Sequence, residues 1–269
     1  MPRSRMRVDH QVPITSREMF SSPYSDIPID KDDPRGREPL IPMESVGVAF
    51  ESYYAKTDGH NPPFGRAIEG SRKDVWLRKS VAEKLARVNE LLRSFETELF
   101  VLDGHRSVAS QQGLWDFYYG KAQQENPGGS AQEYRARAMQ FIIDPASFDE
   151  ADSRTWPAHT NGAAIDLTLR DSVSRELLDM GANFEQDTEA SIGDYFERQL
   201  IAGHIDESDV RLQNRRLLNW AMTREGLLNE TAKVFWHYDW GNQIYVRASR
   251  AFLQDPPKAA WYGYIDPPI

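Results

Sequence analysis

Two histidines of this chain stand in settings that could hold a metal ion, and the first is followed by an aspartate. His159 and Asp166 are seven residues apart in the segment His-Thr-Asn-Gly-Ala-Ala-Ile-Asp. A fully extended chain would separate them by roughly 23 Å, because it advances ~3.3 Å per residue. Asn161 and Gly162 tolerate positive φ and could reverse the chain, and the small residues 163–164 would leave room for an ion. A metal site is one interpretation, and a hairpin with a surface histidine is the other.

The second histidine, His237, lies in the aromatic segment Phe235-Trp-His-Tyr-Asp-Trp240. An imidazole in so apolar a strand is expected to be partly buried, and burial favours its neutral form. The neutral imidazole is the form that binds metal ions. A core histidine packed between aromatic rings, without any ligand role, is the alternative interpretation.

An arginine follows the end of a probable buried strand in the segment Val101-Leu-Asp-Gly-His-Arg106. Arg106 could project from that end into a cleft and stabilise a negatively charged oxygen in a transition state. A salt bridge with one of the many acids of the chain is the alternative. His105, beside it, carries a side chain that titrates near neutral pH.

These residues need strands and helices to position them, and the hydrophobic pattern predicts a set of both. Apolar residues at 81, 85, 88 and 92 recur at helical spacing. Ser130 and Glu133 form a capping box that would begin another helix, and Gly241-Asn242 is typical of a two-residue hairpin. We expect helices over 75–96, 111–119, 130–142 and 210–226, strands over 46–54, 99–102, 163–169, 233–240 and 243–247, and a long loop over 179–193.

This order of elements predicts an α+β fold, with a single domain in which a small antiparallel sheet is flanked by helices. Residues 1–45 are rich in Pro, Asp, Arg and Ser and show no sustained periodicity. We therefore expect an N-terminal arm over 1–45 and one domain over 46–269. The arm should pack over the domain at Phe20, Tyr24 and Ile27.

Composition argues against several classes of protein. The 269 residues include 41 acids, 32 Lys and Arg residues and no cysteine. The excess of negative charge argues against a nucleic-acid or anionic-membrane surface, and the lack of cysteine excludes thiolate metal sites and cysteine nucleophiles. No apolar run approaches the ~20 residues of a membrane span, and the basic first residues lead into polar ones. We expect a cytoplasmic protein with no nucleic-acid or membrane partner.

Together these segments resemble the D-alanyl-D-alanine dipeptidase family, the zinc D,D-dipeptidases of vancomycin resistance, related in fold to the D,D-carboxypeptidases and the hedgehog signalling domain. The family motif Ser-x-His-x-x-Gly-x-Ala-x-Asp matches residues 157–166 from the His onward, and Asp-Gly-Tyr-Arg matches residues 103–106. Residues 179–184 look like the family's Met-Gly-x-x-Phe-Asp stretch, and the late His-Tyr-Asp-Trp-Gly stands at 237–241. The resemblance covers roughly residues 45–250.

The resemblance implies zinc ligands His159, Asp166 and His237, with Arg106 near the carbonyl of a small dipeptide-like, amide or amino-acid-like substrate. The pattern breaks at Val234, where the family has a Glu that acts as general base and acid. Val cannot take a proton, and loss of a positioned acid or base typically costs ~10²–10⁴ in rate. The family's Ser before the first ligand and Tyr before the arginine are also replaced, here by Pro and His.

Three functions are compatible with this altered pattern. The first is a zinc hydrolase of a dipeptide or small amide, in which His105, Glu230 or the substrate itself handles the proton. The second is a non-haem iron oxidative enzyme, since two histidines and one carboxylate form its facial ligand set and its chemistry does not need the lost base. The third is a protein that binds a metal or small ligand without turnover. We expect the first, a repurposed metalloenzyme with Arg106 and His105 as catalytic residues.

Overall fold

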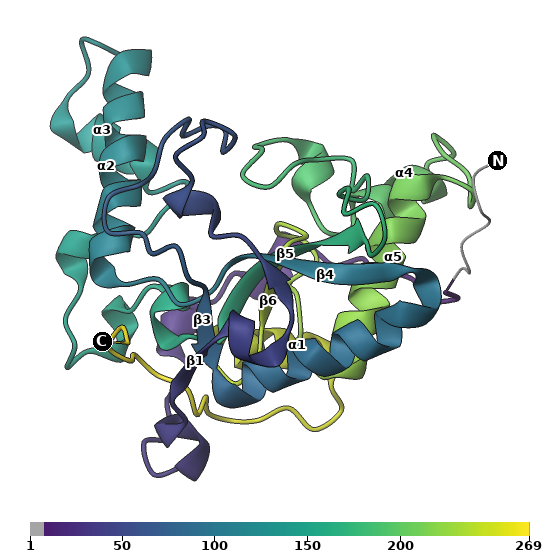
Figure 1. Cartoon of the computed structure of the whole chain (residues 1–269). Coiled ribbons are helices and arrows are strands. Elements are labelled where there is room, and N and C mark those ends of the chain that lie inside the picture. The colour runs from purple at the N-terminus through teal and green to yellow at the C-terminus, as the bar shows by residue number, and fades with distance from the viewer. Residues whose placement is uncertain (1–7, 269) are drawn as a thin grey trace.

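A four-stranded sheet occupies the centre of the structure, a computed structural model that describes residues 8–268 (Figure 1). Its strands are β2 (Ala49–Phe50), β4 (Thr97–Asp103), β5 (Ala164–Asp171) and β6 (His237–Asp239), and they lie side by side in that order. The pairs β4/β5 and β5/β6 are antiparallel, whereas β2 runs parallel to β4. A separate two-stranded sheet pairs β1 (Leu40–Pro42) with β3 (Trp76–Arg78). The expected α+β class with a small sheet is confirmed, except that one strand pair is parallel.

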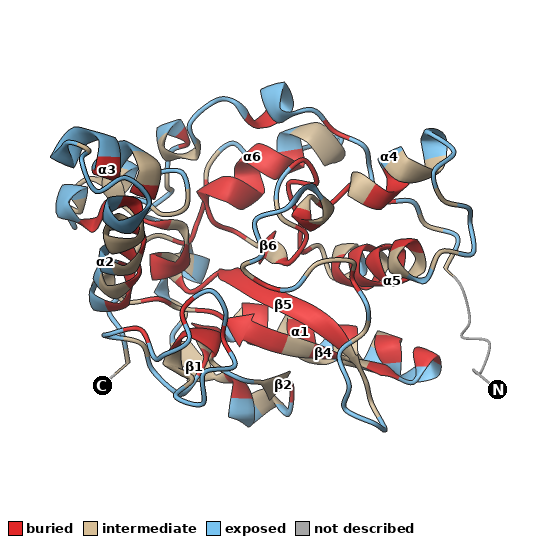
Figure 2. Cartoon of the chain, turned by 90° about the horizontal axis from the view of Figure 1, so that it is seen from above, coloured by how far each residue is buried: buried red, intermediate tan, exposed pale blue. Residues whose placement is uncertain are grey.

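Helices surround this sheet. The helix α1 (Lys79–Leu92) packs against β4, and α5 (Val210–Arg224) packs against α1 and β5. The pair α2 (Val108–Glu125) and α3 (Ala131–Ala138) projects at one end of the molecule, away from α4 (Tyr195–Ile201) at the other end (Figure 1). The last helix is α6 (Gln243–Phe252). Figure 2 shows β5 buried along most of its length, as expected of a strand between packed layers.

The helix α1 follows the predicted apolar spacing, but it is shorter than expected. Val81, Leu85, Val88 and Leu92 are fully buried on one face, which stabilises the packed helix by roughly 1.5–3 kcal/mol for each side chain. The first residues of the predicted helix instead form β3, whose partner β1 comes from the N-terminal segment. The sequence alone could not reveal this pairing, because the partner strand is distant in the chain. The predicted capping box at Ser130 and Glu133 is present.

One of the predicted strands is wrong, and another is much shorter than expected. The residues after Gly241 form α6 rather than the second strand of a hairpin, because Asn242 is the helix N-cap and accepts a hydrogen bond from Tyr245 N at 2.9 Å. Within the strand predicted over 46–54, only Ala49–Phe50 pairs with β4, and Tyr53–Ala55 forms the short 3-10 helix η5. Apolar and aromatic runs of this length fit a strand or a buried helix equally well.

The described part of the N-terminal segment, residues 8–45, lies against the rest of the chain. Phe20 and Ile27 are buried as expected, whereas Tyr24 is only partly buried. The backbone N–H groups of Val12 and Thr15 donate to Glu197 and Asp194, at 2.9 and 3.0 Å. The division into an arm and a domain at residue 45 stays a prediction. Within residues 8–268, no helix combines the length and apolarity needed to cross a bilayer.

Candidate metal centre

Three adjacent strands bring acidic and imidazole side chains to one level of the central sheet. Asp166 on β5 is paired directly with His237 on β6 and, on its other side, with Asp103 on β4. The fourth side chain, His159, comes from the short 3-10 helix η9 (Ala158–Asn161) that precedes β5. Hydrogen-bonded strands lie ~4.8 Å apart, so this register sets the spacing of Asp103, Asp166 and His237.

The predicted chain reversal occurs at Gly162. Its φ is +70°, and a Cβ at this position would lie 2.3 Å from Leu40 Cδ2. Glycine is therefore required both by the backbone angle and by the close approach of the N-terminal segment. The small residues Ala163 and Ala164, expected to leave room for an ion, are fully buried in the core and do not line the cleft described below.

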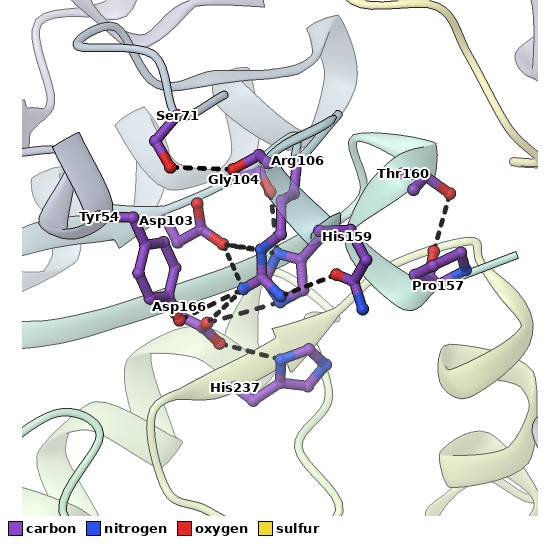
Figure 3. A network of polar contacts seen from close by, with 12 residues as sticks. Tyr54, Ser71, Asp103, Gly104, Arg106, Pro157, His159, Thr160, Asp166 and His237 are labelled. Atoms are coloured by element: carbon purple, nitrogen blue, oxygen red, sulfur yellow. Dashed lines mark hydrogen bonds and ion pairs between the residues drawn. The ribbon is translucent and has the colours of Figure 1, made fainter. Parts of the chain in front are cut away.

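His159, Asp166 and His237 place one possible ligand atom each within 4.8 Å of one another. Asp166 lies between the two imidazoles, with Oδ2 at 3.5 Å from His159 Nε2 and Oδ1 at 2.9 Å from His237 Nδ1 (Figure 3). The two imidazole ring centres are 5.1 Å apart. The sequence prediction that these three residues converge agrees with this geometry.

In each imidazole, the ring nitrogen that does not face Asp166 lies against another oxygen atom, which orients the ring. His159 Nδ1 lies 2.8 Å from the Gly104 carbonyl and donates to it, so Nε2 is left to bind a metal. His237 Nε2 lies 3.0 Å from Asp239 Oδ2 in a charge contact, and Nδ1 faces Asp166. Outer partners of this kind fix the tautomer and raise the basicity of metal-binding histidines.

The charge state of His159 also suits a metal ligand. Burial lowers the pKa of His159 to about 3, so the imidazole is neutral at physiological pH. His237 differs: although burial opposes it, the charges of Asp239 and Asp166 raise its pKa well above the ordinary value, so a bound metal would have to displace a proton from this ring. Two imidazole nitrogens and one carboxylate oxygen are the ligand types of a zinc site that keeps an open position. The residues present therefore fit a divalent metal ion.

Arg106 faces this cluster from the end of β4. Its Nη2 lies 2.7 Å from Asp103 Oδ2 and 3.9 Å from Asp166 Oδ2, and its backbone N donates to the His159 carbonyl at 3.1 Å. Gln111 Oε1 lies 3.4 Å from Nη1. The guanidinium is buried, and although burial opposes it, the charge of Asp103 raises the pKa of Arg106 above its ordinary value. Arg106 is thus a fixed cation beside the metal ligands.

A cleft of about 990 Å³ opens over this group. Its floor includes the three candidate ligands and Arg106, and Val234 lies on its wall. Further wall residues from η5, α2, the segment 137–143 and the loop after β5 include Tyr54, Gln111, Tyr118, Phe141 and Glu185. The cleft gives a small molecule access to the metal centre.

A family model described as D-ala-D-ala dipeptidase matches residues 45–255, well over half of the chain. The chain belongs to this family. A D-alanyl-D-alanine dipeptidase of Synechocystis sp. is 26% identical over 256 residues, covering 91% of this chain and 97% of the relative. A second, from Escherichia coli strain K12, is 33% identical over 175 residues, covering 65% of this chain and 71% of the relative.

Two solved structures are also similar, each at 14% sequence identity. One is the vancomycin resistance D,D-pentapeptidase VanY from the VanB-type cassette with Zn(II), with a TM-score of 0.36 over 64% of this chain and 77% of that chain. The other is VanYB in complex with D-alanine-D-alanine, with a TM-score of 0.35 over 64% of this chain and 76% of that chain. Both likenesses are distant.

Within this member of the dipeptidase family, the two residues suggested as proton carriers lie outside the cleft. His105 Nε2 lies 3.0 Å from the carbonyl oxygen of Ile265, and His105 lines a separate small pocket with Asp103 instead of the cleft. Glu230 is buried and bound by both Nε and Nη2 of Arg247. Neither position fits the expectation that the group exchanges a proton with a substrate at the metal centre.

Sequence reasoning missed three polar residues of the cleft. Tyr54 was expected at the end of a strand, Gln111 at the start of a helix, and Glu185 follows directly after the family-like stretch that ends at Phe184. Only Glu185 had a detectable pattern, because it stands where the family stretch has its final Asp. The other two face the site only through the packing of η5 and α2.

Proposed function

We propose that this chain is a zinc-dependent hydrolase that cleaves the amide bond of a small dipeptide or similar amino-acid-like molecule. The observation that carries the proposal is the convergence of His159, Asp166 and His237 beside the buried guanidinium of Arg106, at the floor of an open cleft. The dipeptidases to which the chain is similar support a dipeptide as the substrate class.

His159 Nε2, His237 Nδ1 and an oxygen of Asp166 would hold the ion. When bound, zinc would supply Lewis acidity that polarises a carbonyl oxygen and lowers the pKa of water. The rest of the chemistry falls to side chains of the chain itself.

Arg106 is placed to donate hydrogen bonds to the carbonyl oxygen of the substrate as negative charge develops there. The Asp103 carboxylate fixes the guanidinium through Nε at 3.2 Å and Nη2 at 2.7 Å, so the donor does not have to reorganise during the reaction. Asp103 is thus a positioning residue for Arg106. Val234 has no group that exchanges a proton, so it cannot act as the acid and base.

The test begins with protein purified without added metal. Elemental analysis should give zinc, and incubation with D-Ala-D-Ala and a panel of dipeptides should release free amino acids. Asp166→Asn should lose both zinc and turnover, whereas Asp187→Asn, an exposed acid on the same cleft, should keep both. Bound iron with oxygen-dependent turnover, or full zinc occupancy with no hydrolysis of the panel, would contradict the proposal.

A further inference from the structure

A carboxylate that takes no part in the metal cluster projects into the cleft from the loop after β5. Glu185 is partly buried, and its two oxygens accept hydrogen bonds from phenol groups on different elements. Tyr54 of η5 donates to Oε1 at 2.6 Å, and Tyr118 of α2 donates to Oε2 at 2.8 Å. Both bonds come from neutral donors, so these contacts hold the carboxylate in place without neutralising its charge.

Glu185 is linked to the candidate metal ligand Asp166 through two side chains, Tyr54 and Arg106. The Tyr54 hydroxyl that donates to Glu185 also lies 3.3 Å from Nη2 of Arg106, and that same nitrogen lies 3.9 Å from the ligand Asp166. Figure 3 shows the Tyr54 ring beside Asp166, with its hydroxyl close to the guanidinium of Arg106. The carboxylate therefore stands next to the place where Arg106 would meet a substrate oxygen.

The backbone at Glu185 is one that glutamate rarely adopts. Gln186 N donates to the Asn183 carbonyl at 3.2 Å and closes a turn, in which Glu185 has a φ of +61°. Glycine or asparagine is favoured at such a position, and strained residues of this kind cluster at functional sites. The turn is held by Phe184, which packs edge-on against Tyr53 at 4.8 Å and Trp236 at 5.3 Å between ring centres. The local backbone does not favour a glutamate here, but Glu96 and Arg175 also have positive φ without lining the cleft, so the case for Glu185 rests on its side-chain contacts.

The other proton-carrying groups of the cleft are poorly suited to exchange protons at the metal centre. Asp187 and Glu189 are exposed, and Lys233 is paired with Glu230 at 3.0 Å. Tyr54 and Tyr118 stay protonated, because burial raises the pKa of each phenol. Of the described residues that line the cleft, Glu185 is thus the one carboxylate that is neither a metal-ligand candidate nor exposed.

We propose that Glu185 is the acid and base of the hydrolysis, which deepens the proposed function and rests on it. Its carboxylate takes a proton from the water that attacks the carbonyl carbon. The C–N bond then breaks, and the same proton passes from the Glu185 carboxyl group to the departing amine nitrogen. One amide and one water give one carboxylic acid and one amine, and Glu185 returns to its starting state.

The surroundings of Glu185 favour this role. Burial, and to a lesser extent the negative charge of Asp166, raises the pKa of Glu185, while the two tyrosine hydroxyls and the charge of Arg106 lower it. The net direction is upward, toward the pH at which the enzyme would work. An acid-base catalyst is most effective when its pKa lies near that pH.

The decisive variant is Glu185→Gln, which keeps the shape of the side chain but cannot take up a proton. In the full-length zinc-loaded protein, with the dipeptide that the wild type hydrolyses best, we expect kcat to fall by ~10²–10⁴ with KM and zinc content little changed. Glu176→Gln, an exposed acid of the same loop after β5 that does not line the cleft, is the matched control and should keep kcat within about twofold of the wild type. Unchanged kcat in Glu185→Gln, or an effect confined to KM, would overturn the assignment.

A second variant keeps the test independent of folding defects in the first. Tyr118→Phe removes a hydrogen bond that lowers the pKa of Glu185, so the acid limb of the pH profile of kcat should move to higher pH. An unmoved limb in a folded, zinc-loaded Tyr118→Phe protein would also overturn the assignment. A zinc-loaded wild type that hydrolyses no dipeptide would instead overturn the proposed function, and the role of Glu185 with it.

Discussion

The metal cluster and the opposite wall of the cleft are built in different ways. Asp166 and His237 are direct partners in the β5/β6 ladder, so backbone hydrogen bonds set their separation. Glu185 lies on an irregular loop, and its position depends on side-chain contacts with Tyr54 and Tyr118. One region is fixed by the sheet, and the other is fixed by packing.

This difference implies that the two regions respond differently to mutation. A change on the loop should alter turnover while zinc remains bound, whereas a change among the ligands should remove zinc and turnover together. Variants on each side of the cleft can therefore separate binding of the metal from movement of the proton.

The largest effect is expected for His237→Ala, which removes a ligand on the sheet side. Zinc affinity should fall by more than the roughly 10- to 100-fold that is typical for loss of an outer partner, and hydrolysis should be lost with it. Equilibrium dialysis with zinc, together with circular dichroism as a check on folding, measures this. A folded variant with wild-type zinc affinity would contradict the role of His237 as a zinc ligand.

Arg106→Lys should keep the metal and lose most of the rate. Lysine retains the charge but not the two-point contact that Arg106 makes with Asp103 through Nε and Nη2. We expect kcat to fall by about 10²–10³, the usual cost of losing one donor to a developing oxyanion. Steady-state kinetics on zinc-saturated protein would reveal it, and an unchanged kcat would argue that Arg106 has a purely structural role.

Asp239→Asn should weaken the hold on His237 without removing a ligand. Asp239 Oδ2 lies 3.0 Å from His237 Nε2, and loss of such a partner typically costs about 10- to 100-fold in metal affinity. Competition with a chelator of known affinity would measure the change. Asp187→Asn provides the comparison, because it removes an exposed acid of the cleft that contacts neither histidine.

The smallest effect is expected for Phe184→Leu, which loosens the loop that carries Glu185. Zinc affinity should be unchanged, and kcat should fall by less than the roughly 100-fold that a 1 Å misplacement of a reacting group can cost. A parallel loss of zinc would show that the loop and the sheet are not independent.

The convergence of the three candidate metal ligands could be expected from the sequence through the family resemblance of residues 157–166 and 237–241, whereas each motif alone left a structural alternative open. Only six histidines are present, and His159 stands before a glycine that the reversed backbone requires. The placement of Arg106 beside the cluster was expected in the same way, from the match of residues 103–106 to a family motif.

The cleft wall could not be predicted, because it depends on contacts between distant segments. Tyr54 and Glu185 are 131 positions apart and meet only after the chain has folded. His105 illustrates the opposite error: it is adjacent to Arg106 in sequence, but its ring is turned toward Ile265. The segment after Gly241 shows a third limit. Its residue pattern fits a strand, whereas in the structure Asn242 caps the helix α6.

The most direct test of the metal centre is an anomalous diffraction map at the zinc edge from crystals of the zinc-loaded protein. It should show a single strong peak at ~2.0–2.2 Å from His159 Nε2, His237 Nδ1 and an oxygen of Asp166, with Arg106 facing the open side. A peak elsewhere in the molecule, with this cluster empty, would contradict the account.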